Sequence, residues 1–259
     1  MPELVEVESY RRLAESVVGR EIEEVVAEDD WYLKRGLTPG TVKAALTGRT
    51  ITGTRRIGKL LLLDTDGPVL GLRFGMAGRP VIDGQPGVEW LLYTPKEILD
   101  RWDRFSLRFR GGGDLRMIDP RRLGGVELDP PEARLGPDAL TVTPSALERV
   151  LGNSAAPLKA RLMDQTRLAG VGNLAADEVL WRSGLDPARP AGSLSPAERR
   201  RLHRHLRAAL ADLLAQGGSH TGDLVPHRRP GGLCPKDGTP LVRRTVGGRT
   251  TWSCPRHQA

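Results

Sequence analysis

The sequence predicts an α+β protein, with a strand-rich N-terminal half and a helical C-terminal half that a β-hairpin closes. In the first half, short apolar runs alternate with glycine-containing turns. From Asp129 onward a proline-rich stretch intervenes, and the sequence beyond it shows helical periodicity and capping residues. The expected domains are a β-sandwich over 1–129, a helical domain over 137–216 and a terminal hairpin over 230–259.

The N-terminal half begins with a helix, whose apolar residues recur at helical spacing from Leu4 to Val17 before Gly19 ends it. A short helix is expected after Thr38-Pro39. Strands are expected at 22–27, 50–56, 60–64, 69–74, 104–110 and 115–118. Regular short strands favour a sandwich or a barrel, on which the opening helix would pack.

The C-terminal half carries four segments with helical patterns. They lie at 144–151, 158–163, 173–183 and 196–215. The last begins with a capping box formed by Ser195 and Glu198, in which each side chain would bond the other residue's backbone amide. A hairpin with Gly247-Gly248 at its tip is expected after the helices.

Composition limits the class of protein. The 259 residues include 39% hydrophobic residues, enough for a sizeable core and two domains. A net charge of +7, carried mostly by arginine, suits a polyanionic partner such as nucleic acid. The sequence has no apolar run of membrane-spanning length and no charged-then-apolar leader, so we expect a cytoplasmic protein without a membrane partner.

The extreme N-terminus combines a proline with acidic residues. Removal of Met1 would leave Pro2 with a free secondary amine, which can attack an aldehyde carbon and form an iminium. Glu3 would be adjacent to that nitrogen, and Glu6 would lie one helical turn further on. The alternative is structural, because proline and acidic residues are also favourable in the first turn of any helix.

Two loops carry further chemical interest. Gly170-Val171-Gly172-Asn173 leads into a helix that Asn173 would cap, and its amides could grip a phosphate with Lys159 as a supporting charge. An ordinary interhelical turn is the alternative. The second loop, 119–125, places paired arginines beside the 74–78 segment, where exposed Met, Leu and Arg side chains could wedge into a base stack.

The two cysteines lie in knuckles near the C-terminus, each followed by a second ligand type. Cys234 precedes Asp237 and Cys254 precedes His257, each with two residues between. This spacing is typical of a tetrahedral site for one structural Zn²⁺ per chain. A metal-free hairpin with two buried thiols is the alternative.

Together these motifs give a resemblance. The chain resembles the formamidopyrimidine-DNA glycosylase and endonuclease VIII family over nearly its whole length, and the Met-Pro-Glu-Leu start and Asp-Pro-Arg-Arg loop favour its formamidopyrimidine branch. The resemblance implies a monomeric base-excision-repair enzyme that flips a damaged base out of double-stranded DNA, excises it and cleaves the strand. It also implies a helix–two-turn–helix domain and a zinc-finger-like hairpin.

The resemblance also implies residue roles. Pro2 matches the Schiff-base nucleophile, Glu3 the proton donor and Lys59 the β-hairpin lysine, while Arg249 matches the finger arginine associated with phosphate binding and the second elimination. The remaining matches contact DNA. Met76, Arg121 and Leu123 match the positions that fill the void left by the flipped base, and Arg122, Lys159 and Asn173 match positions that hold the backbone.

Some residues depart from the family pattern. Val5 replaces a second proline, Leu123 replaces a phenylalanine, and Asp237 and His257 stand where cysteines are usual. The segment 217–232 is short and lacks the long loop associated with 8-oxoguanine. Formamidopyrimidines or oxidised pyrimidines therefore remain open as substrates, including an endonuclease VIII-like specificity. A damage-binding protein that does not cut DNA is the alternative from another class.

Overall fold

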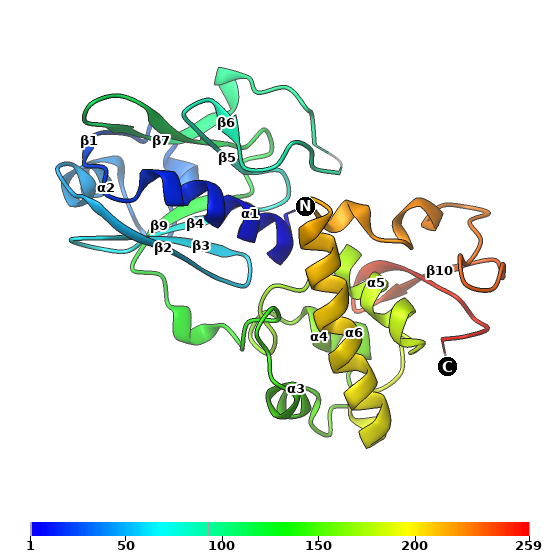
Figure 1. The fold of residues 1–259 in the computed structure, drawn as a ribbon. Coiled ribbons are helices and arrows are strands. Elements are labelled where there is room, and N and C mark those ends of the chain that lie inside the picture. The colour runs from blue at the N-terminus through cyan, green and yellow to red at the C-terminus, as the bar shows by residue number, and fades with distance from the viewer. Residues whose placement is uncertain (1, 93, 259) are drawn as a thin grey trace. The chain divides into compact units, whose positions relative to one another are not determined.

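The computed structural model describes residues 2–92 and 94–258, and they form two compact units (Figure 1). One unit contains Pro2 and residues 6–132, and the other contains residues 3–5 together with the chain from Ala133 onward. The first is built on strands and the second on helices, which confirms the α+β prediction. No helix in the described part of the chain is long and apolar enough to cross a membrane.

The first unit holds two antiparallel sheets. The five-stranded sheet has the order β1-β7-β8-β5-β6, and the four-stranded sheet the order β2-β3-β4-β9. The strands of the larger sheet are β1 Ile22–Val26, β5 Arg79–Ile82, β6 Gln85–Pro86, β7 Asp103–Phe109 and β8 Asp114–Ile118. Those of the smaller sheet are β2 Ile51–Ile57, β3 Leu60–Thr65, β4 Leu70–Arg73 and β9 Gly125–Leu128.

The core of this unit joins both sheets and two helices, α1 Leu4–Ala14 and α2 Pro39–Leu46. Val7, Tyr10 and Ala14 lie on the buried face of α1, at the spacing that places side chains above one another on a helix. The opening helix therefore packs as its pattern predicted. Its Leu4 differs, because this side chain belongs to the core of the helical unit.

The helical unit contains α3 Pro144–Leu151, α4 Leu158–Met163, α5 Asn173–Ser183 and α6 Pro196–Ala215, the same bounds that the sequence predicted. Ser195 and Glu198 form the expected capping box of α6. Gly172, not Asn173, is the N-cap of α5, so the expected capping role of Asn173 is wrong.

The terminal hairpin consists of β10 Val242–Val246 and β11 Arg249–Ser253, closed by a turn at residues 247–248 (Figure 1). It has a small core of its own against α5. Trp181, Leu224, Cys234, Leu241, Trp252 and Cys254 form this cluster. Such a small core stabilises a hairpin only weakly, so the hairpin also depends on the polar contacts around this core for its stability.

Candidate functional site

Pro2 and Glu3 lie immediately before α1, which begins at Leu4. Pro2 is buried and is not the first helical residue, so the structural explanation of this proline as a helix starter does not apply here. Glu6 is also buried, in the first turn of α1. Met1 lies outside the described residues, and its removal remains an expectation.

The carboxylate of Glu3 occupies the N-terminus of α5. Its Oε1 accepts a hydrogen bond from the backbone N–H of Leu174 at 2.8 Å, and its Oε2 accepts from those of Gly172 at 3.0 Å and Ala175 at 3.1 Å. Glu3 is only 2% exposed. The partial positive charge of the helix N-terminus favours such an anion.

This arrangement narrows the expectation that the loop at 170–173 grips a phosphate. The three amides bonded to Glu3 already hold an anion, a side chain of the same protein, and among them only the N–H of Gly172 belongs to this loop. The N–H of Gly170 donates to Oε1 of Gln165 at 2.9 Å. Phosphate binding by the remaining amides of the loop stays a prediction.

The two glycines of this loop make room for the N-terminal segment. A Cβ at position 172 would lie 2.2 Å from Cδ of Glu3, and one at position 170 would lie 2.3 Å from Cδ1 of Leu4. The backbone N–H of Leu4 also donates to the carbonyl of Gly170 at 3.1 Å. Glycine permits this close approach of backbone to a neighbouring segment.

Lys159 was expected to hold the DNA backbone, and in this structure its side chain is fully buried. Its Nζ forms an ion pair with Oδ1 of Asp177 at 2.7 Å and donates to the carbonyl of Thr250 at 3.1 Å and to Oγ1 of Thr251 at 2.8 Å. Burial lowers the pKa of Lys159 because it disfavours the ammonium, although Asp177 partly offsets this effect. Asn173 is half-buried.

The loop between β8 and β9 is organised by the buried carboxylate of Asp119. Oδ1 accepts from the backbone N–H of Arg121 at 3.0 Å, and Oδ2 accepts from that of Gly124 at 2.8 Å. Arg121 and Leu123 project from the loop as exposed side chains, with Leu123 51% exposed. A short buried carboxylate therefore fixes the backbone of a loop whose tip faces solvent.

The second proposed wedge segment contacts this loop directly. A Cβ at Gly75 would lie 2.3 Å from the backbone carbon of Leu123, so only glycine allows the two segments to touch. Met76 follows and is 39% exposed. Met76 on one loop therefore lies next to the loop that carries Arg121 and Leu123, because the two backbones are in direct contact at Gly75.

Arg122 has an unusual conformation, with φ at 54°. Its guanidinium forms a two-point ion pair with the carboxylate of Asp29, at 2.7 and 2.5 Å. The left-handed conformation costs a non-glycine residue about 1–2 kcal/mol, and this pair helps to offset that cost. About half of the Arg122 side chain remains exposed.

Lys59 lies in the tight turn between β2 and β3. The neighbouring Arg56 donates to the carbonyl of Gly58 at 2.9 Å and to Oε2 of Glu8 at 3.0 Å. Hydrogen bonds from Arg11 and Arg56 lower the pKa of Glu8 although its burial acts in the opposite direction. The turn that carries Lys59 is therefore tied to α1, the helix that follows Pro2.

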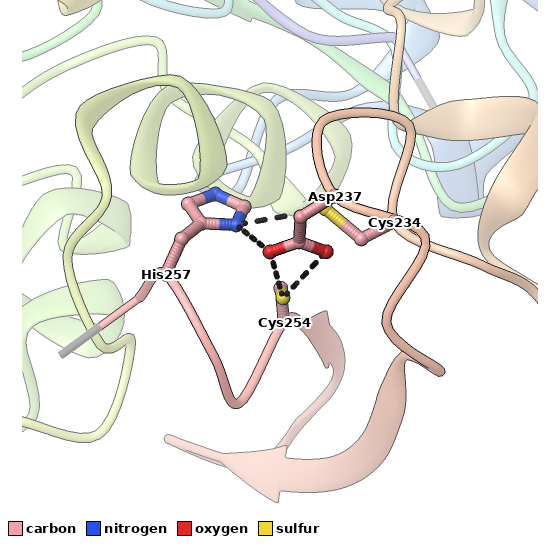
Figure 2. Close-up of side chains that lie close together, drawn as sticks. All are labelled: Cys234, Asp237, Cys254 and His257. Atoms are coloured by element: carbon pink, nitrogen blue, oxygen red, sulfur yellow. Dashed lines mark hydrogen bonds and ion pairs between the residues drawn. The ribbon is translucent and has the colours of Figure 1, made fainter.

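The four predicted metal ligands converge at the base of the hairpin (Figure 2). Their donor atoms all lie within 4.8 Å of one another. Nδ1 of His257 is 3.5 Å from Sγ of Cys234 and 3.3 Å from Oδ2 of Asp237, and Sγ of Cys254 is 3.3 Å from the same oxygen. In a tetrahedron with bonds of about 2.0–2.3 Å, donors lie roughly 3.3–3.8 Å apart. The side chains therefore fit a tetrahedral ion.

Neighbouring groups orient these donors. Nε2 of His257 lies 3.1 Å from the carbonyl of Trp181, which can only accept, so Nε2 carries the proton and Nδ1 is free to coordinate. The indole N–H of Trp181 donates to Sγ of Cys234 at 3.4 Å. The backbone N–H of Thr239 bonds Oδ1 of Asp237 at 2.9 Å and holds the pKa of this carboxyl well below its usual range.

Several of these supporting residues were not singled out in the sequence. Asp119 lies inside the Asp-Pro-Arg-Arg motif, and its position between a strand and two arginines could have indicated a loop-organising carboxylate. Asp177 and Trp181 lie on the buried faces of α5, where residue type gives no signal of a polar partner far away in sequence. Arg249, at the start of β11, is exposed as expected.

Comparison with known proteins identifies the family. The N-terminal domain of formamidopyrimidine-DNA glycosylase matches residues 1–126, and the H2TH domain of the same family matches residues 135–224. The chain is 36% identical to the formamidopyrimidine-DNA glycosylase of Methylococcus capsulatus over the whole of both chains. It is 37% identical to that of Thermus thermophilus, covering 100% of this chain and 98% of the relative.

Solved structures give the same answer. The Lactococcus lactis Fpg protein in complex with abasic-site DNA has a TM-score of 0.83 at 27% identity, over 99% of each chain. Its complex with DNA containing a formamidopyrimidine lesion gives the same values. The chain therefore belongs to the formamidopyrimidine-DNA glycosylase family of DNA repair enzymes.

Proposed function

We propose that the chain excises oxidised bases from double-stranded DNA with Pro2 as the nucleophile and then cleaves the strand at the resulting abasic site. The observation that carries the proposal is the Pro2–Glu3 pair, in which a buried carboxylate is fixed by three backbone amides directly beside the N-terminal proline. Similar proteins bear the name of this activity, and the Lactococcus lactis structures hold abasic and formamidopyrimidine-containing DNA.

In the proposed reaction, the Pro2 nitrogen forms a bond to C1′ and the glycosidic bond breaks, so that the base leaves with the electron pair and takes up a proton. Glu3 protonates the ring oxygen as the sugar opens to an iminium. The iminium acidifies C2′, and loss of that proton expels the 3′ phosphate. A second elimination, supported by Arg249, expels the 5′ phosphate, and Lys59 assists proton transfer in these steps.

The DNA contacts belong to the loops of the first unit. Met76, Arg121 and Leu123 are exposed on two adjoining loops, and in the proposal they fill the space that the flipped base leaves. Arg122 is half-exposed and holds a backbone phosphate, for which it would exchange its present partner Asp29. Asn173 is retained as a backbone contact.

The hairpin would be held by one zinc ion. Cys234, Asp237, Cys254 and His257 present two sulfurs, one carboxylate oxygen and one imidazole nitrogen at tetrahedral spacing. Zinc accepts such a mixed set, although two thiolates bind it less strongly than four. The ion would supply structural stability to a hairpin with a small core, and it takes part in no chemical step.

Borohydride trapping tests the nucleophile. With Met1 removed, reduction in the presence of an abasic-site duplex should give a covalent adduct at Pro2. Pro2→Gly keeps an amine and should retain some trapping, whereas Glu3→Gln should lose base excision. An extra residue before Pro2 turns its nitrogen into an amide and should abolish the adduct. Full trapping by that extended protein would refute the proposal and point to Lys59.

Lesion preference is the second question, and one observation disfavours 8-oxoguanine while it leaves formamidopyrimidines and oxidised pyrimidines, the endonuclease VIII-like range, as candidates. The segment 217–232 is short and folded into two 3₁₀ turns, Ser219–Thr221 and Val225–His227. The backbone N–H of Leu224 within it donates to Oε2 of Glu178 at 2.9 Å. It forms no long loop that could close over 8-oxoguanine. Cutting a panel of single-lesion duplexes would rank formamidopyrimidines, oxidised pyrimidines and 8-oxoguanine, and binding without cutting would favour the damage-binding alternative.

A further inference from the structure

We propose that Lys159 and Asp177 are positioning residues that fix the strand carrying Arg249 onto the helical unit, without touching DNA themselves. The inference rests on the proposed function, in which Arg249 contacts phosphate and supports the second elimination. It replaces the direct phosphate contact that the sequence suggested for Lys159.

The pair holds three consecutive residues of β11, directly after Arg249. Nζ of Lys159 donates to the carbonyl of Thr250 and to the hydroxyl of Thr251. Oδ2 of Asp177 accepts from the backbone N–H of Trp252 at 3.3 Å. Since a strand moves as a unit over so few residues, these bonds set the place and direction of Arg249.

The tip of the hairpin is fixed at the same point of the helical unit. A Cβ at Gly247 would lie 2.6 Å from Cβ of Ala160, the neighbour of Lys159 on α4. Gly247 also has a φ of 56°, which glycine adopts at no steric cost. The turn before Arg249 and the strand after it therefore both rest on the start of α4.

The cluster places two cations against one carboxylate, and the protein encloses all three groups. Lys159 and Asp177 are both 0% exposed, and Arg228, whose side chain is 7% exposed, pairs with Oδ2 of Asp177 at 2.8 Å. A buried ion pair often contributes no more stability than an apolar pair of similar volume, because both charges must be desolvated. The ion pair instead orients the strand, because the hydrogen bonds from Lys159 and to Asp177 form only when β11 lies in the position seen here.

The metal-ligand cluster anchors the opposite end of the same strand, because Cys254 follows Ser253 immediately. The hairpin is thus attached at its base and at its tip, and Arg244 on β10 also pairs with Asp186. The separation of base from tip allows folding of the hairpin to be measured independently of the placement of Arg249. Zinc content reports the first, and the action of Arg249 reports the second.

The test compares three variants: the double variant Lys159→Met/Asp177→Asn, the single variant Arg249→Ala, and the triple variant that combines all three substitutions. The double variant removes both buried charges, and its asparagine side chain still offers an oxygen to Arg228. We expect about one zinc per chain in all of them. The fraction of product that has undergone the second elimination at an abasic duplex should fall in the double variant by up to about 100-fold, the loss that a misplacement near 1 Å can cause. Because it is a ratio of products, it does not depend on the fraction of active protein.

Binding to a duplex with an uncleavable tetrahydrofuran site gives the second measurement. If the pair acts through Arg249, the triple variant should bind as Arg249→Ala does, with the same salt slope. A direct phosphate contact by Lys159 would instead lower the slope by roughly 0.9 more, as one further phosphate is lost. Lys43→Met, at an exposed lysine on α2, shows how the loss of one lysine charge outside this cluster changes the slope, whereas the double variant leaves the net charge unchanged.

The outcomes separate the two proposals. Failure of the unaltered protein to form a borohydride adduct would refute the proposed function. The positioning role alone would be overturned if trapping were normal and either of two results were seen. One is that the losses in DNA binding add up in the triple variant. The other is that the product ratio and the salt slope of the double variant are unchanged. Loss of zinc in the double variant would also overturn it, because the pair would then serve the folding of the hairpin.

Discussion

Gly172→Ala is the sharpest test of the carboxylate site at the start of α5. The added methyl would lie 2.2 Å from Cδ, 2.4 Å from Oε1 and 2.5 Å from Cγ of Glu3. Gly172 has a φ of −115°, which alanine adopts without strain. The substitution therefore acts only through the space that Glu3 occupies.

The expected magnitude follows from these distances. Carbon atoms pack at about 3.5–4.0 Å, so the carboxylate must move by more than about 1 Å. Hydrogen bonds of 2.8–3.1 Å cannot survive such a shift, and each one to a charged group is worth about 1.5–3 kcal/mol. Because the displaced carboxylate and amides regain water in part, we expect a loss of about 2–4 kcal/mol in the free energy of unfolding.

Catalysis should suffer more selectively. Misplacement of Glu3 by about 1 Å should slow base excision about 100-fold. Borohydride trapping at a preformed abasic site should persist, since Pro2 itself is unchanged. Denaturant unfolding and single-turnover excision measure the two effects. Gly40→Ala on α2 is the control, because a Cβ there meets only one atom, at 4.0 Å. Wild-type stability and excision in Gly172→Ala would refute the assignment of Glu3 to this site.

Three further changes test other parts of the molecule. Met76→Ala should slow excision of a stacked lesion far more than cleavage at a preformed abasic site, whereas equal losses would contradict the wedge role. Cys254→Ser should remove the zinc, measured by metal analysis, and a metal-free preparation with full cleavage activity would contradict the site. Arg189 and the backbone N–H of Ser195 lower the pKa of Glu198 to about 2. The charge of Glu198 therefore stabilises α6 fully above pH 4.5 and loses this effect as the pH falls toward 2. Glu198→Gln should cost no more than about 1 kcal/mol in unfolding free energy near neutral pH, because the pair is partly exposed, and the difference from wild type should vanish in acid.

Helix bounds were predictable because short-range chemistry determines them. Pro144 and Pro196 stand at the first helical positions, and Thr143 and Ser195 supply the caps. Strands β5, β6 and β9 were not predicted. They are only two to four residues long, and glycines flank them, so they lack the period-two pattern on which strand prediction depends.

The sequence offered candidate residues for the site but not the contacts that they make. Glu3 and Gly172 are 169 residues apart, and no local pattern shows that the loop's amides bind this carboxylate. Lys159 has the residue type of a surface charge, and only the fold reveals Asp177 beside it. By contrast, the cluster that could hold a metal was predictable because Cys234 and Asp237, like Cys254 and His257, are paired at the spacing that one knuckle requires.

The ligand set of the hairpin also bears on how the protein withstands oxidants. Hydrogen peroxide converts cysteine thiolates to sulfenic and higher acids, which no longer hold a metal, whereas carboxylates and imidazoles are outside that chemistry. With Asp237 and His257 in the cluster, only Cys234 and Cys254 offer sulfur to an oxidant, and both are buried. In the proposed function, the enzyme removes oxidised bases and therefore works where such oxidants arise. Having two thiolates in place of four lowers the affinity for zinc. It also leaves fewer sulfur atoms at which the oxidants that damage DNA could inactivate the enzyme.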